Sequence, residues 1–461
     1  MERSWSCRST STSGAFIRSL LAGTGNLNRT RSGGCSVRER AASGSRLGSI
    51  TGVSFVACSA APSIPEGSWS FCGSWEDASL GTGGCSWANA GNFCGPLGPR
   101  RRRNSGKPNL ERVPAGNASS VNDRFRMIMI GAGRIASQSH LPAILACEGV
   151  DLVAIVDSTP GRAAKLAREY GLSVQIFSDL EPALEDADGA IVATPNDTHH
   201  EIATRCLMRG VHVLVEKPMT SAYAEALTLS ELARNTGFKA MVGYVTRHRR
   251  NVRLMKTLLD QKHFGQVSNF AYQFGTIGGW APLAGYRSDA GGRGAGVLAI
   301  SASHFLDRML WFWGYPLDMT YLDDGSKGPE ANCVAKFQFE GGMHGTLRCS
   351  KSASLPGGLV LDTETGRVVL PEVEDADIVL LPNENQHLQY VLKSRDQHTG
   401  PDRDPFLAQI SDFVSACKTG GGFGCDFNQG AASMRLIEDL YSRRQPLKQD
   451  WYSSLDSGES R

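Results

Sequence analysis

The sequence predicts an α/β fold that begins at about residue 124 of the 461-residue chain. Two observations predict it. From that point onward, short apolar runs alternate with helical patterns, which is typical of a parallel sheet covered on both faces by helices. Before that point, neither the period of a strand nor that of a helix persists over a useful length. Residues 1–123 are therefore interpreted separately from the folded part.

Residues 1–123 have an unusual composition. They carry 14 Lys and Arg against 7 Asp and Glu, and their 22 Ser and 18 Gly make up about a third of the segment. Such a stretch cannot bury enough apolar surface to offset the entropy of ordering, so we predict a disordered extension. Its first fifty residues hold eight Arg and only two Glu, which is also typical of an organellar transit peptide. We expect a cytoplasmic protein, with organellar import as the alternative.

Charge and cysteine content exclude several classes of protein. The net charge of +2 does not favour a nucleic-acid partner, and residues 124–461 alone are acidic, with 34 basic and 39 acidic side chains. No apolar run approaches the ~18 residues of a membrane span. The 12 cysteines show no zinc spacing, so we predict no metal site. Free thiols are expected for the six later cysteines, whereas a disulfide framework stays open for the six early ones.

The elements of the first domain follow from apolar runs bounded by polar or glycine residues. Each run of four or five apolar residues predicts a buried parallel strand, and each helical pattern closes at a glycine or polar turn. Strands are predicted at 127–130, 152–156, 174–177, 189–193, 211–215 and 239–242, and helices at 136–144, 161–170, 179–185, 198–209 and 221–235.

The first apolar run leads into the glycine-rich segment GAGRIA at 131–136. Gly131 allows a tight turn, and Gly133 lets the backbone approach a pyrophosphate at the N-terminus of the next helix. Ala136 stands in place of the third glycine, where the helix packs on the sheet. With the βα alternation around it, this segment predicts a dinucleotide-binding Rossmann domain over residues 124–244.

Asp157 follows the second apolar run, 21 residues after Ala136. A carboxylate at this place is expected to bind the adenosine ribose hydroxyls. The next residue is Ser158 rather than an arginine, which favours NAD, but Arg162 is near enough to leave NADP open. Taken alone, Asp157 could instead be a helix N-cap.

Two further segments follow the fourth and fifth apolar runs, TPNDTH at 194–199 and EKP at 216–218. Together with GAGRIA they resemble the Gfo/Idh/MocA oxidoreductases, and the resemblance covers essentially all of residues 124–461. Both segments lie at the carboxyl ends of strands, where sheets of this kind bind ligands. The resemblance implies an NAD(P)-dependent enzyme that acts on a sugar, polyol or related hydroxy compound.

The resemblance also implies roles for individual residues. Lys217 would polarise the substrate oxygen and His304 would exchange the hydroxyl proton, as hydride passes between the substrate and the nicotinamide. The expected cofactor contacts are Gly131, Gly133, Arg134, Ile135, Asp157, Thr194, Pro195, Asn196, His199, Glu216 and Lys217. The expected substrate contacts are Arg247, Tyr286, Arg287 and Asp307. Taken alone, Lys217 could be a surface lysine and His304 a core histidine.

The second domain is predicted over residues 245–461. Helices are expected at 253–259, 297–313, 405–416 and 429–441, and strands at 267–274, 332–339, 344–349 and 368–370. The resemblance implies that this is an α+β domain in which the strands form an open, mostly antiparallel sheet with helices on one face. The other face often supports dimers in the family, so we expect a homo-oligomer.

The helix at 297–313 departs from the family pattern Asp-x-Gly-x-His-x-x-Asp. His304 and Asp307 match the pattern, whereas Ile300 and Ala302 stand where Asp and Gly are expected. In the enzymes that Asp completes a catalytic triad with Lys and His, and losing one proton-transfer group costs roughly 10²–10⁴ in rate. Residues 298–307 are locally similar to the fungal galactose-pathway repressor branch. The alternative to an enzyme is therefore a dinucleotide-binding regulatory protein with little or no activity.

Overall fold

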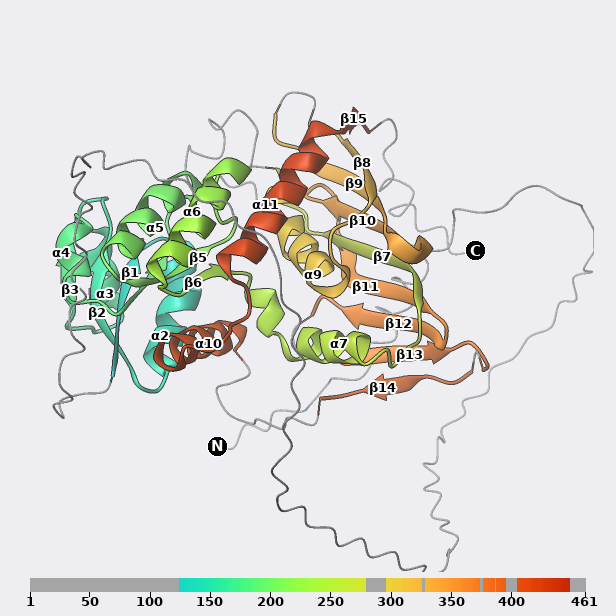
Figure 1. The fold of residues 1–461 in the computed structure, drawn as a ribbon, viewed down its shortest axis with the longest axis horizontal. Coiled ribbons are helices and arrows are strands. Elements are labelled where there is room, and N and C mark those ends of the chain that lie inside the picture. The colour runs from blue at the N-terminus through green and yellow to red at the C-terminus, as the bar shows by residue number, and fades with distance from the viewer. Residues whose placement is uncertain are drawn as a thin grey trace, which may run out of the picture. The chain divides into compact units, whose positions relative to one another are not determined.

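The computed structural model of this chain describes residues 124–278, 296–325, 328–373, 376–385, 387–394 and 404–447. These residues belong to one compact unit and form two sheets with their helices (Figure 1). The predicted disordered extension at 1–123 lies outside the described residues, as do Tyr286 and Arg287.

The first sheet has six parallel strands, in the order β3-β2-β1-β4-β5-β6. All six strands predicted from the apolar runs are present, namely β1 (Phe125–Ile130), β2 (Val150–Val156), β3 (Gln175–Phe177), β4 (Gly189–Val192), β5 (His212–Glu216) and β6 (Ala240–Gly243). The chain order runs outward from β1 in both directions. The carboxyl ends of β1 and β4 are therefore the topological switch point, where such sheets bind ligands.

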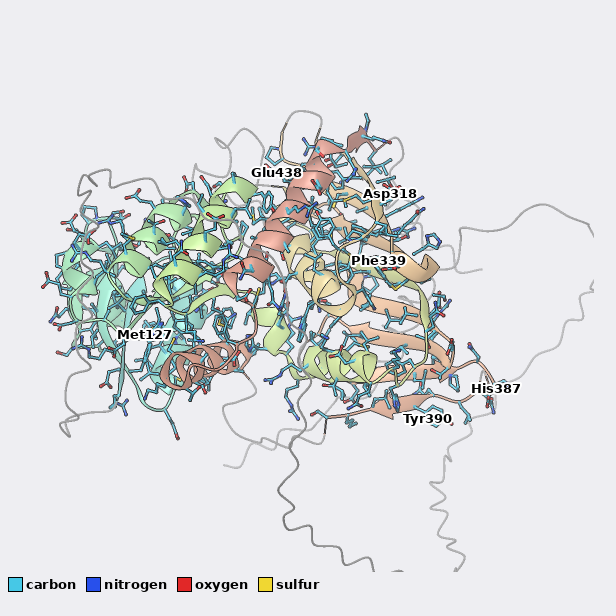
Figure 2. All side chains as sticks on the ribbon, in the orientation of Figure 1. Met127, Asp318, Phe339, His387, Tyr390 and Glu438 are labelled. Atoms are coloured by element: carbon cyan, nitrogen blue, oxygen red, sulfur yellow. The ribbon has the colours of Figure 1, made fainter. Side chains whose placement is uncertain are left out.

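Helices cover both faces of this sheet, which explains why its strands are apolar on both sides. They are η1 (Ala136–His140), α2 (Leu141–Ala146), α3 (Arg162–Glu169), α4 (Glu181–Leu184), η2 (Asn196–Thr198), α5 (His199–Met208) and α6 (Tyr223–Thr236). Within β1, Met127 and Met129 join the core under α2 and α3, whereas Ile128 and Ile130 join the core under α5 and α6. Figure 2 shows Met127 among the side chains of this sheet.

A late helix completes the core of the first sheet. Helix α10 (Pro405–Thr419) contributes Leu407, Ile410 and Phe413 to the cluster that contains Met127. Its N-cap is Asp404, whose side chain accepts a hydrogen bond from the Phe406 amide. Helix α10, which lies within the range predicted for the second domain, thus packs on the first domain.

The second sheet has nine strands, in the order β14-β13-β12-β11-β7-β10-β9-β8-β15. They are β7 (Val267–Gly275), β8 (Asp318–Asp323), β9 (Asn332–Gln338), β10 (His344–Ser350), β11 (Leu355–Thr363), β12 (Gly366–Pro371), β13 (Ile378–Pro382), β14 (Tyr390–Leu392) and β15 (Arg444–Pro446). Two neighbouring pairs, β7 with β10 and β8 with β15, are parallel and the others antiparallel. The predicted open and mostly antiparallel sheet is confirmed.

One face of the second sheet packs against helices α7 (Arg250–Asp260), α9 (Ser303–Trp313) and α11 (Phe427–Ser442). Phe270 of β7 stacks on Trp313 of α9 with ring centroids 4.7 Å apart, and Phe305 stacks on Tyr272 at 3.9 Å. These aromatic contacts fix α9 on the sheet. The predicted helix at 297–313 is present, but its first turn, η4 (Leu298–Ala302), has π-type hydrogen bonding.

Candidate active site

The glycine-rich turn has the shape that a dinucleotide needs. Gly131 has a φ of +97°, and a Cβ there would lie 2.6 Å from the Ala193 carbonyl oxygen, so only glycine fits between β1 and β4. A Cβ at Gly133 would meet no atom within 4 Å. The helix that includes Arg134 and Ile135 starts there, and the N–H groups of a first helical turn have no partners within the helix. The turn therefore fits a pyrophosphate.

Asp157 braces this turn from the end of β2. Its Oδ2 accepts a hydrogen bond from the Ala132 amide at 2.8 Å, and its Oδ1 accepts one from the Thr159 amide at 2.8 Å. The second bond, two residues along the chain, is a local turn contact and not a helix cap, because the N-cap of α3 is Gly161. Arg162 Nη1 lies 3.5 Å from Oδ2 and is half-exposed. Asp157 as a ribose ligand stays a prediction.

His199 joins the two loops that follow β4 and β5. Its Nδ1 lies 3.0 Å from the Pro218 carbonyl oxygen and its Nε2 lies 3.0 Å from that of Thr194. Burial lowers the pKa of His199 below its usual value, although both carbonyls favour the protonated ring. The Asn196 amide donates to Ser221 at 3.4 Å. His199, 1 % exposed, thus holds the loops that contain Thr194, Pro195 and Lys217 against each other.

A buried contact between His140 and Glu216 supports the EKP loop. His140 Nε2 lies 2.8 Å from Glu216 Oε1, and Glu216 Oε2 accepts the Lys217 amide at 3.0 Å. Burial alone would raise the pKa of Glu216, but the hydrogen bond and charge of His140, with Lys217, hold this pKa below its usual value. His140 was not identified from the sequence, where it is a single histidine in an apolar helix.

Lys217 reaches the helix that carries the other predicted catalytic residue. Its Nζ donates a hydrogen bond to the Ile300 carbonyl oxygen at 2.9 Å, and the Lys217–Pro218 peptide bond is cis. Ile300 lies in the π-type turn η4, one helical turn before His304. A backbone carbonyl of the residue that replaces the family aspartate therefore accepts the hydrogen bond of the lysine.

His304 has the properties of a proton acceptor. Its Nδ1 is buried and has no hydrogen-bond partner among the described residues, and its ring meets that of Tyr244 edge-on at 6.1 Å. Burial lowers the pKa of His304 well below its usual value, and three neighbouring cations lower it further, namely Lys217, Arg308 and Arg249. The imidazole is thus neutral at neutral pH, and the role of His304 in proton exchange stays a prediction.

Two predicted substrate residues contact each other inside the protein. Arg247 Nε and Nη2 lie 2.7 Å from the two carboxylate oxygens of Asp307. Arg247 Nη1 also donates to the Gly424 carbonyl at 2.6 Å and to Gln429 at 2.9 Å. Both charged side chains are buried, at 3 % and 0 % exposure. These contacts are structural, and a role of either residue in substrate binding stays a prediction.

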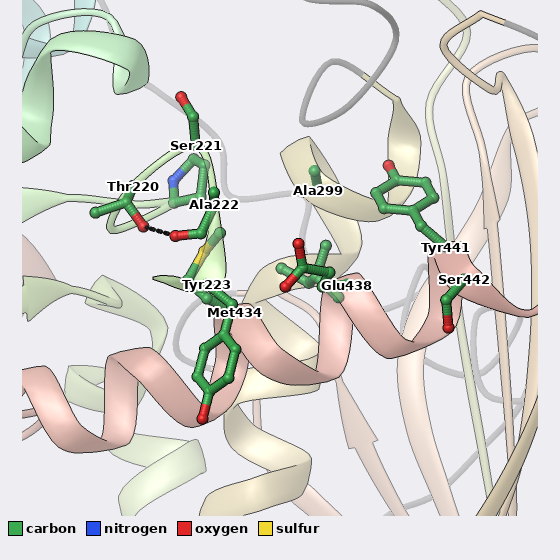
Figure 3. A pocket seen from close by; sticks show the side chains of 11 residues that line it. Thr220, Ser221, Ala222, Tyr223, Ala299, Met434, Glu438, Tyr441 and Ser442 are labelled. Atoms are coloured by element: carbon green, nitrogen blue, oxygen red, sulfur yellow. Dashed lines mark hydrogen bonds between the residues drawn. The ribbon is translucent and has the colours of Figure 1, made fainter. Parts of the chain in front are cut away.

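A cavity of about 200 Å³ lies beside the Lys217–Ile300 contact. Pro218 and Ala299, which adjoin those two residues in the chain, both line it. Figure 3 shows Ala299 facing Glu438 and Tyr441 of α11 across this cavity.

Within the described ranges, no three His, Cys, Asp or Glu side chains cluster as a metal site would need. Likewise, no helix in the described part is long and apolar enough to cross a membrane.

Family comparisons cover both sheets. Residues 125–244 match the oxidoreductase family with an NAD-binding Rossmann fold, and residues 252–369 match the GFO/IDH/MocA C-terminal domain. The uncharacterized oxidoreductase YdgJ of Escherichia coli (strain K12) is 30% identical over 203 residues, which are 43% of this chain and 57% of YdgJ. Glucose-6-phosphate 3-dehydrogenase of Bacillus subtilis (strain 168) is 29% identical over 146 residues, which are 32% of this chain and 41% of that enzyme.

The NAD(+)-dependent scyllo-inositol 2-dehydrogenase of Bacillus subtilis (strain 168) is 30% identical over 129 residues, or 28% of this chain and 37% of that enzyme. The chain therefore spans between 37% and 57% of the length of these three relatives. Levoglucosan dehydrogenase, solved with NADH and levoglucosan, superposes with a TM-score of 0.62 at 18% identity over 69% of this chain and 97% of that one. This superposition shows that the fold is shared.

Proposed function

The chain belongs to the Gfo/Idh/MocA family of oxidoreductases and has an NAD-binding Rossmann domain, and on that premise we propose a dehydrogenase of small hydroxy compounds. It transfers a hydride between the nicotinamide and a CH–OH group of a sugar, polyol or related compound. The observation that carries this proposal is the hydrogen bond from Lys217 to Ile300, which holds the lysine one helical turn from His304. The names of two relatives, a sugar-phosphate and an inositol dehydrogenase, support the substrate class.

The two side chains have complementary roles in this proposal. When bound at the glycine-rich turn, the dinucleotide supplies the hydride acceptor or donor. Lys217 Nζ, oriented by the Ile300 carbonyl, polarises the substrate oxygen. Neutral His304 takes the hydroxyl proton during oxidation and returns it during reduction. Because burial and the neighbouring cations make proton uptake costly, the His304 ring is a weak base that readily gives up a proton once it has accepted one.

The regulatory alternative finds no support in these comparisons. Dehydrogenases and an oxidoreductase are the relatives described above. Both predicted catalytic side chains are present here, and the lost carboxylate at position 300 is replaced by a backbone acceptor. The likeness of residues 298–307 to a repressor branch is local, and both Lys217 and His304 are present in this chain.

Turnover by the purified full chain tests the proposal. We expect NADH formation with at least one member of a panel of sugars, sugar phosphates, inositols and hydroxy acids. Lys217→Ala and His304→Ala should each lower kcat at least ~10²-fold while the Kd for NAD stays nearly unchanged. Lys239→Ala and His200→Ala are matched controls. The Lys239 side chain donates to the Gly420 and Gly421 carbonyls and lies over the Phe423 ring, and the His200 ring contacts the Thr228 hydroxyl.

The outcome that contradicts the proposal is equally specific. If no compound is turned over and the two alanine variants bind NAD like the parent, the chain is a dinucleotide-binding regulator. Homo-oligomerisation through the second sheet stays a prediction, which sedimentation of the purified full chain would check.

A further inference from the structure

The helical segment that carries Ile300 and His304 begins against a residue from another part of the chain. Glu330 precedes β9, and its carbonyl accepts the Val297 amide at 2.9 Å. Its carboxylate Oε1 accepts the Leu298 amide, also at 2.9 Å. Glu330 thus satisfies two of the N–H groups that a helix start leaves without partners, as a capping residue would, although it lies 32 positions away from Leu298.

The Glu330 carboxylate is enclosed by donors from three elements. Besides the Leu298 amide, Tyr441 of α11 donates to Oε1 at 3.0 Å, and Arg444 of β15 lies 3.1 Å from Oε2. A Cβ at Gly296 would overlap the carboxylate, so a side chain there would displace the carboxylate from the start of the helix. Glu330 is 0 % exposed. The group is therefore a buried junction between η4, α11 and β15.

The charge around this junction makes it sensitive to pH. Burial raises the pKa of Glu330 to about 7, and the nearby charge of Asp323 on β8 raises it as well. Asp323 also accepts Arg444 Nε at 2.6 Å. The other titratable groups facing the junction are Tyr441, Tyr321 and Cys333. The three donors suit the ionised carboxylate, since a protonated one would point an O–H among them.

We propose that Glu330 is a positioning residue for the reaction: it anchors the first turn of the helix and thereby places the Ile300 carbonyl that holds Lys217. Leu298 and Ile300 lie in the same turn, so a shift at the Leu298 amide moves that carbonyl. Misplacing a catalytic group by ~1 Å can cost ~10² in rate. Glu330 touches neither Lys217 nor His304, and the catalytic part of this inference rests on the proposed function.

The activity test compares two carboxylates of the same junction in the full chain. Glu330→Gln removes the charge at the helix start, whereas Asp323→Asn removes the other partner of Arg444 and leaves the Leu298 bond in place. We expect Glu330→Gln to lower kcat at least ~10-fold with the Kd for NAD unchanged, and Asp323→Asn to keep kcat within about twofold. Equal loss in both variants would mean a purely structural role and would overturn the proposal.

The pH profile gives a readout that stability alone does not move. In the parent, kcat should fall as the pH drops through about 7, where Glu330 takes up a proton. That limb should be absent from Glu330→Gln. It should be present in Asp323→Asn but at a lower pH, because the charge of Asp323 raises the pKa of Glu330. A limb that persists unchanged in Glu330→Gln contradicts the proposal.

Hydrogen exchange separates this inference from the proposed function, because it needs no substrate. In the full chain, Glu330→Gln should speed amide exchange in residues 297–302, and Asp323→Asn should not. Tyr441→Phe is a milder second variant, since it deletes only one donor to Oε1 and should give a smaller increase. Unchanged amide exchange at residues 297–302 in Glu330→Gln would contradict the positioning role of Glu330 even if the protein is an active dehydrogenase. Faster exchange of these amides in a protein that turns over no substrate would support the positioning of the helix start by Glu330 and would contradict only the proposed function.

Discussion

Ile300 shows how a residue can replace an aspartate without a polar side chain. From its type alone, isoleucine at this position removes both a charge and an acceptor from the site. In the structure, its backbone carbonyl accepts Lys217 Nζ at 2.9 Å, from within a π-type turn. Such turns often occur at functional sites. Isoleucine does not restore a negative charge beside His304. Among the residues that the structure describes, the charges that lower the pKa of His304 are those of three cations, Lys217, Arg308 and Arg249.

That difference predicts the effect of Ile300→Asp on pH dependence. A carboxylate one turn before His304 favours the charged ring and raises the pKa of His304 from its lowered value. Activity that needs the neutral ring should then be lost at a higher pH than in the parent. The pH dependence of kcat/KM and NMR titration of the ring would measure this. The control is Ile300→Asn, because asparagine has nearly the shape of aspartate but no charge. A similar rise in the pKa of His304 in that variant would contradict the explanation.

Asp157 shows how one side chain stabilises an element. Its carboxylate joins the glycine-rich turn after β1 to the loop after β2, through bonds to the Ala132 and Thr159 amides. The turn must keep its N–H groups aimed at the phosphates, and a fixed backbone lowers the entropic cost of binding. The carboxylate thus braces the turn rather than capping α3, whose N-cap is Gly161, and ribose binding by Asp157 stays a prediction.

Asp157→Ala should therefore weaken NAD binding by about 10–100-fold, the loss expected for hydrogen bonds to a charged group. NADP should lose less, because the carboxylate repels a 2′-phosphate. Calorimetric titration with both dinucleotides would measure the difference. Asp151→Ala, which breaks only a half-exposed pair with Arg124, should leave both affinities unchanged. Tighter binding of NADP than NAD by the parent would show the NAD preference to be wrong.

The elements of the two sheets were not equally predictable. The strands of the first sheet other than the edge strand β3 are mostly apolar, because helices bury both of the sheet's faces, whereas β3 (Gln175–Phe177) is largely exposed. In the second sheet, β11 was missed because it contains Pro356, Gly357 and Gly358, which usually argue against a strand. β14 and β15 have three residues each, too few to show a period. These strands form because longer neighbours supply their hydrogen bonds.

At the scale of the whole molecule, one buried ion pair joins three distant segments. Arg247 follows the first sheet, and Asp307 lies on α9. The Arg247 guanidinium also binds the Gly424 carbonyl, just before α11, and Gln429 in the first turn of α11. Both side chains are buried, so solvent does not screen the attraction between their charges. It therefore holds together the parts of the chain that carry Lys217 and His304.

Breaking this pair should destabilise the whole unit. Asp307→Asn leaves the Arg247 charge buried without its anion, which should cost about 3–5 kcal/mol of unfolding free energy. Urea unfolding of the full chain would measure it. Arg367→Gln breaks the pair with Asp362 at 2.7 Å, which is partly exposed, and should cost less than about 1 kcal/mol. Equal costs in both variants would contradict a special role for the buried pair.

The extension at 1–123 should be dispensable for the fold. The first sheet is complete from Phe125 onward, with β1 at its centre. A chain shortened to residues 124–461 should unfold cooperatively and bind NAD like the full chain. Calorimetry and NAD titration of both lengths would check this, and non-cooperative melting of the shorter chain would refute it.

The sequence by itself determined what depends on neighbours along the chain. Apolar runs, glycines and the TPN and EKP segments predict the parallel sheet, the dinucleotide turn and the residues at its edge, since burial and turn geometry leave a local pattern. Only the tertiary structure decided which polar groups meet. Lys217 and Ile300 are 83 positions apart, His140 and Glu216 are 76, and Leu298 and Glu330 are 32. No periodicity records such pairs, because their contacts arise only when separate elements pack and leave buried donors and acceptors to satisfy one another.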